Sequence, residues 1–67
     1  MMILHVKIWR DDRSFWHAVC EDLPGCQVVA MTEDEARDKM RIAVEGYMAS
    51  MHSVRPVAFD TELVNTG

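Results

Sequence analysis

Residues 16–51 read WHAVCEDLPGCQVVAMTEDEARDKMRIAVEGYMASM and carry most of the signals that predict the fold. The segment Phe15 to Cys20 alternates in the period-two pattern of a strand with one buried face. Pro24-Gly25 then marks a turn, because proline presets a turn φ and glycine tolerates a positive one. We expect a further strand over Cys26 to Met31 and, directly after it, a helix.

The helix signal begins at Thr32-Glu33-Asp34-Glu35, which fits a capping box. Apolar residues follow at helical spacing, and Pro56 is the expected stop. The predicted apolar stripe, which should cover a sheet, comprises Ala36, Met40, Ala43, Val44, Tyr47, Met48 and Met51.

Upstream, Ile3 to Trp9 also alternates and predicts a first strand, with Arg10 to Ser14 as a turn. We predict a hairpin register that pairs Ile8 with Trp16, Val6 with Ala18 and Leu4 with Cys20. On the outward face this register pairs Trp9 with Phe15, Lys7 with His17 and His5 with Val19.

Downstream, Val57 to Val64 is a candidate fourth strand at the sheet edge, either within the subunit or across a dimer. The predicted fold class is therefore α+β: a three-stranded antiparallel meander with one amphipathic helix on one face, in the order β-β-β-α. Residues 1–67 form one domain.

Composition limits the classes of function. A chain of 67 residues has a small core, so assembly with a partner or with itself, as a dimer or tetramer, is expected. The net charge of -4 disfavours direct nucleic-acid binding. No apolar stretch approaches the ~20 residues of a membrane span. His5 and Lys7 interrupt any secretory core, so a cytoplasmic location is expected.

The two cysteines, Cys20 and Cys26, lack CxxC spacing, and we expect buried reduced thiols. A disulfide across the turn is the alternative if the chain is exported. His5 and His17 share a face in the predicted register, but no Cys, Asp or Glu completes a metal shell there. A cysteine nucleophile with a histidine base is not expected, because strand alternation places Cys20 and His17 on opposite faces. We therefore expect no catalytic residue, and likewise no metal and no cofactor.

Several motifs together resemble the HicB-like antitoxin family, whose members accompany HicA-type toxins. They are the aromatic strand Phe15-Trp16-His17-Ala18, the turn Asp22-Leu23-Pro24-Gly25-Cys26, and the helix start Thr32-Glu33-Asp34-Glu35-Ala36. Ala43, Val44, Glu45 and Tyr47 are similar to the helix ending of the family. Ala30 and Met31 depart from the family pattern, since members commonly have glycine and a polar residue just before the helix threonine.

The resemblance implies a partial, degraded ribonuclease H-like domain that binds instead of catalysing. Ile3 to Trp9 holds no acid for the first position of a ribonuclease H metal site. Many family members also carry a C-terminal DNA-binding domain, which this sequence does not contain, so we expect no operator binding by this chain alone. The implied partner is a HicA-like messenger-RNA endonuclease, neutralised by protein contact.

Two surfaces are candidates for partner binding. The outward sheet face carries Trp9, Phe15, His17 and Val19, typical of an interface, and a homo-oligomer contact is the alternative reading. The helix start carries Glu33, Asp34 and Asp38, which would complement a basic toxin or simply form a solvated face. The alternative functions are an orphan structural homo-oligomer without a toxin and, more remotely, an RNA-processing enzyme using His5 and His17.

Overall fold

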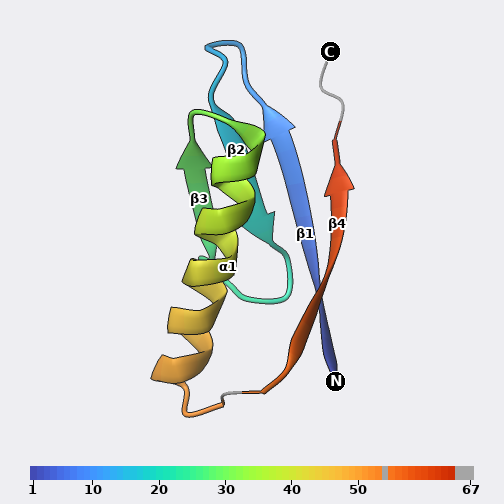
Figure 1. Cartoon of the computed structure of the whole chain (residues 1–67), viewed down its shortest axis with the longest axis vertical. Helices are drawn as coiled ribbons and strands as arrows, with labels where there is room; N and C mark the ends of the chain where they lie inside the picture. The colour runs from blue at the N-terminus through green and yellow to red at the C-terminus, as the bar shows by residue number, and fades with distance from the viewer. Residues whose placement is uncertain (54, 65–67) are drawn as a thin grey trace.

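The computed structural model describes residues 1–53 and 55–64, and it has one helix packed on a four-stranded sheet (Figure 1). The elements are β1 (Met2–Arg10), β2 (Trp16–Cys20), β3 (Gln27–Ala30), α1 (Glu33–Ser50) and β4 (Val57–Leu63). The strand order is β3-β2-β1-β4. The predicted α+β class, with a meander, a covering helix and a fourth edge strand, is confirmed.

β4 lies parallel to β1, whereas β1, β2 and β3 pair antiparallel, so the sheet is mixed. The chain leaves β3, crosses the sheet through α1 and returns beside β1 (Figure 1). With α1 in front of the sheet, the chain passes from β3 on the left to β4 on the right (Figure 1), so the connection is right-handed, as expected for parallel strands joined through a helix. The candidate fourth strand, Val57 to Val64, therefore pairs within the subunit. Residues 65–67, which follow it, lie outside the described residues.

The predicted hairpin register is wrong by two residues. Ile8 pairs with Ala18, and Trp9 pairs with His17 instead of Phe15. The error arose because Arg10, assigned to the turn, continues β1 and pairs with Trp16. An even shift leaves every side chain on its predicted face, so the burial pattern survives the correction.

α1 begins at its predicted cap, because Thr32 Oγ1 accepts a hydrogen bond from the Glu35 N–H at 3.1 Å. It ends before Pro56 is reached, in a Schellman motif. The Ser53 N–H donates to the Met48 carbonyl, and the His52 N–H donates to the Ala49 carbonyl. His52 lies in the left-handed region, at φ 54°. Met51 is consequently the C-cap and is 52% exposed, so its predicted place in the apolar stripe is wrong.

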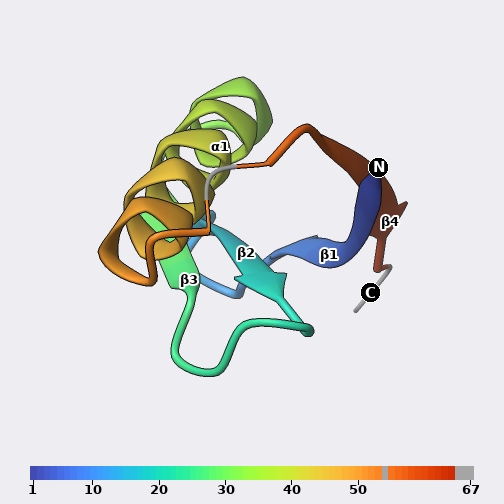
Figure 2. The same cartoon turned by 90° about the horizontal axis from the view of Figure 1, so that it is seen from below.

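The core lies between α1 and the helix-facing side of the sheet, seen along the strands in Figure 2. α1 packs mainly on β2 and β3. Since alternate residues point to one side, β1 supplies its even-numbered side chains and the helix supplies one stripe. The buried residues are Leu4, Val6, Ile8, Ala18, Cys20, Leu23, Cys26, Ala30, Ala36, Met40, Val44 and Met48.

Candidate functional site

The sheet face opposite α1 carries the polar and aromatic side chains of the odd-numbered positions of β1 and β2. α1 lies on the other side of the sheet (Figure 2), so no helix of the described residues covers this open face. Of the predicted binding residues, Trp9, Phe15, His17 and Val19 belong to this face or its adjoining hairpin loop. We call these four residues the aromatic patch.

Trp9 and His17 form the centre of the aromatic patch. They occupy directly opposed positions on β1 and β2, and their rings stack with centroids 5.2 Å apart and planes 7° apart. His17 Nε2 also lies 2.7 Å from Oδ2 of Asp11. The imidazole is thus held on two sides, by a ring face and by a carboxylate.

Asp11 organises the hairpin loop beside the patch. Its Oδ1 accepts hydrogen bonds from the backbone N–H groups of Arg13 at 2.8 Å and Phe15 at 3.0 Å. The contact with His17, reinforced by these two backbone bonds, lowers the pKa of the Asp11 carboxyl below its usual range. The loop also contains Ser14 in the left-handed region, at φ 69°, as is common in tight turns.

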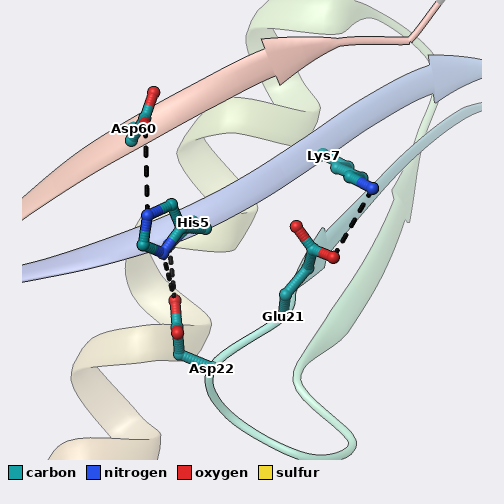
Figure 3. Close-up of polar contacts among 5 residues, drawn as sticks. All are labelled: His5, Lys7, Glu21, Asp22 and Asp60. Carbon is teal, nitrogen blue, oxygen red and sulfur yellow. Dashed lines mark hydrogen bonds and ion pairs between the residues drawn. The ribbon is translucent and has the colours of Figure 1, made fainter.

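A second group surrounds His5, as shown in Figure 3. Asp22 Oδ2 accepts the His5 backbone N–H at 2.6 Å and lies 3.0 Å from ring Nδ1. Nε2 of the same ring lies 4.0 Å from Asp60 on β4. His5 therefore links the β2–β3 loop to the edge strand, and Lys7 pairs beside it with Glu21 at 3.5 Å.

The His5 group has the electrostatics of a mutually stabilising pair. The hydrogen bond and charge of Asp22 raise the pKa of His5 above 6.5. The backbone and ring hydrogen bonds from His5 lower the pKa of Asp22. This pair pins the β2–β3 loop to β1. Because both side chains are solvent-exposed, the imidazole and the carboxylate remain accessible.

The predicted register pairs Lys7 with His17 and would place His17 only two residues from His5 along the strands, and this placement is wrong. In the observed register Glu21 lies beside His5, since its N–H donates to the His5 carbonyl, whereas His17 lies opposite Trp9. Four residues separate the two histidines along the strands, about 13 Å at the usual rise. Each imidazole has its own carboxylate partner. Among the described residues, no group of three or more His, Cys, Asp or Glu side chains is placed to hold a metal ion.

The predicted acidic residues of the helix lie on the other side of the sheet from the aromatic patch. Glu33 pairs with Arg37 at 3.0 Å, and Asp38 pairs with Arg41 at 3.6 Å. Asp34 is exposed in the first turn. The charges of two of the three acids are thus offset by neighbouring arginines, which reduces the attraction of the helix start for a basic partner.

The contacts that Asp11, Asp22 and Asp60 make with histidines were not predicted from the sequence, although Asp22 was named there as part of the turn motif. The Asp-Asp-Arg-Ser run at 11–14 carried a usable signal, because an aspartate at the start of a turn often accepts backbone N–H groups two residues on. No local sequence signal could have identified Asp60, since its position beside His5 depends on how β4 pairs with β1.

Comparisons with known proteins give no relative: no family model matches the chain, and neither the curated proteins nor the solved structures yielded a match. The described part of the chain contains no helix with the length and apolar character needed to cross a bilayer.

Proposed function

We propose that this chain is a protein-binding module with no catalysis of its own, and that its partner docks on the aromatic patch. The observation that supports this most is the Trp9–His17 stack, held in place by Asp11 on an uncovered sheet face. Side chains that are already ordered lose little entropy on binding, and aromatic anchors dominate many interfaces.

The proposed partner is a HicA-type messenger-RNA endonuclease, which the module would inhibit in the cytoplasm by covering the active surface of the toxin. This identity rests on the resemblance of the turn at residues 22–26 and the helix start at 32–36 to HicB-like antitoxins. The net charge of -4 suits a basic partner, because opposite net charges speed diffusional encounter.

The second candidate function is a structural homo-oligomer without a toxin. It is favoured by the small core and by the apolar members of the open face, including Val29 at 50% exposure opposite His17. In a symmetric dimer the same patch would meet its own copy.

The test is light scattering coupled to size exclusion on the purified chain, alone and with the product of a neighbouring small basic reading frame. A mixed complex that suppresses RNA cleavage is the expected result. Self-assembly that ignores the neighbour would instead support the homo-oligomer.

The docking surface is tested by Trp9→Ala and His17→Ala, each checked for folding by circular dichroism. Each should weaken the mixed complex at least about tenfold, as expected for central anchors. Ile42→Ala is the matched control, because Ile42 is 63% exposed on α1, away from the open face. Wild-type affinity in both patch variants would show that the partner docks on another surface.

A further inference from the structure

β4 is a seven-residue edge strand whose outer backbone groups have no strand partner within residues 1–53 and 55–64. The Met2 N–H donates to Pro56 at 3.2 Å, and the Val64 N–H donates to Ile8 at 2.8 Å. Because backbone groups alternate in direction along a strand, the even-numbered residues from 56 to 64 bond to β1. The N–H and C=O groups of Val57, Phe59, Thr61 and Leu63 therefore point to the free edge.

The opposite edge of the sheet is protected. β3 has only four residues, and the Cys20 N–H bonds to the Cys26 carbonyl, so by the same alternation the Val29 carbonyl points outward. Lys39 of α1 donates to that carbonyl at 3.0 Å. Short length and a lysine are common devices against strand addition, and β4 has neither.

The helix-facing side of β4 has an apolar hollow of about 230 Å³ beside it. α1 covers β2 and β3 but leaves β4 clear (Figure 1), so Phe59 is 37% and Leu63 is 56% exposed. Val6, Ile8 and Met40 line the hollow together with Phe59 and Thr61, and Arg37, Asp38 and Arg41 complete its lining. Side chains entering from an added strand would meet mainly apolar surface.

The other side of β4 is acidic. Asp60 and Glu62 project there, since their register partners are His5 and Lys7 of the open face. Glu21 and Asp22 already engage Lys7 and His5 (Figure 3). Four carboxylates thus face one lysine and one histidine, which leaves an excess of negative charge beside the edge.

We infer that the outer edge of β4 is a docking site for an extended segment with alternating apolar and basic side chains. Its backbone would pair with Val57, Phe59, Thr61 and Leu63 as an added strand. Its apolar side chains would enter the hollow, and its lysines or arginines would lie beside Asp60 and Glu62. A second copy of this chain fits poorly, because its own β4 would add two more carboxylates to the same side. The site is separate from the aromatic patch and does not depend on the proposed toxin.

The probe is a capped seven-residue peptide of alternating valine and lysine, matched to the length of β4. The readout is amide hydrogen exchange in the full chain, resolved by residue with NMR. At a peptide concentration about ten times Kd, the four outward amides should exchange about tenfold more slowly, since exchange then requires dissociation. The same peptide with glutamate in place of lysine should give no added protection.

Thr61→Pro is the decisive variant, because it removes an N–H that points to the free edge and is not bonded to β1. It should abolish protection of Val57, Phe59 and Leu63, whereas the matched control Thr61→Val should retain it. The inference is overturned if the lysine peptide protects none of these amides, or if the glutamate peptide protects them equally. It is also overturned if the chain alone protects them increasingly with its own concentration, since a second copy would then be the occupant.

Discussion

Asp11 and His17 form a direct contact across the first hairpin, with Oδ2 of the aspartate 2.7 Å from Nε2 of the imidazole. The same carboxylate accepts the N–H groups of Arg13 and Phe15. One side chain therefore sets both the shape of the loop and the position of the ring that stacks on Trp9. The order of the aromatic patch depends on a residue outside it.

Replacing Asp11 with alanine should lower the midpoint of thermal unfolding at pH 7. The pKa of Asp11 is lowered in the folded state, so its stabilisation is present above its ordinary value of 3.8 and is lost as the pH falls through the folded pKa. The difference from wild type should therefore shrink in acid. Thermal melts at several pH values check this, with the exposed Asp12→Ala as control. A difference independent of pH would contradict the assignment.

A second prediction concerns the pinning of the β2–β3 loop by Asp22. The His5 pKa is raised, so its stabilisation is complete below 6.5 and is lost as the pH rises through the folded pKa. The Asp22 pKa is lowered, so its stabilisation is present above 3.8 and is lost as the pH falls through the folded pKa. The pair should therefore contribute most to the stability of the folded protein between pH 3.8 and pH 6.5, the ordinary pKa values of the two groups.

NMR titration of the His5 ring measures this pair directly. In wild type the His5 pKa should exceed 6.5, and Asp22→Asn should bring it down toward that value. Asp60→Asn is the matched control, because Asp60 is 4.0 Å from the ring and contributes less to the shift. Equal effects of the two variants would mean that Asp22 is not the main partner.

The faces of the strands could be predicted from the sequence because period-two alternation survives an error of two residues. The register could not, since the end of β1 depends on Asp11 closing the loop around Phe15, a side-chain contact that alternation does not report. The helix start was predictable from local capping chemistry alone.

The candidate site was predicted only in part, for the same reason. Trp9 and His17 were placed on one face, but their stacking required the true register. The contact between His5 and Asp60 joins β1 to β4 across the helix crossover. No local pattern encodes such a contact, because the partners are brought together by topology.

A third prediction concerns the end of α1, where His52 has φ 54°. A side chain in the left-handed region costs about 1–2 kcal/mol, whereas glycine adopts it freely at a smaller entropic cost. His52→Gly should therefore raise the free energy of unfolding by up to about 1 kcal/mol, as measured by urea denaturation. His52→Ala keeps the Cβ atom and should give no comparable gain. Equal stability of the glycine and alanine variants would argue against the left-handed cap.

The last prediction concerns the two free thiols, Cys20 and Cys26. They lie at adjoining ends of β2 and the following loop, where the Cys20 N–H donates to the Cys26 carbonyl at 2.9 Å. Both side chains are buried, and burial raises the pKa of both thiols. Cys26 Sγ also contacts Met40 Sδ at 3.9 Å inside the core.

Because the thiolate is the reactive form, neither cysteine should react with an aromatic disulfide reagent in the folded state faster than the chain opens. The factor by which folding slows thiol labelling should match the factor by which it slows hydrogen exchange of core amides, and urea should lower both factors together. Cys20→Ser and Cys26→Ser allow each thiol to be followed separately, with folding checked first. Rapid labelling of either thiol under native conditions would show that the loop over the core opens independently of the sheet.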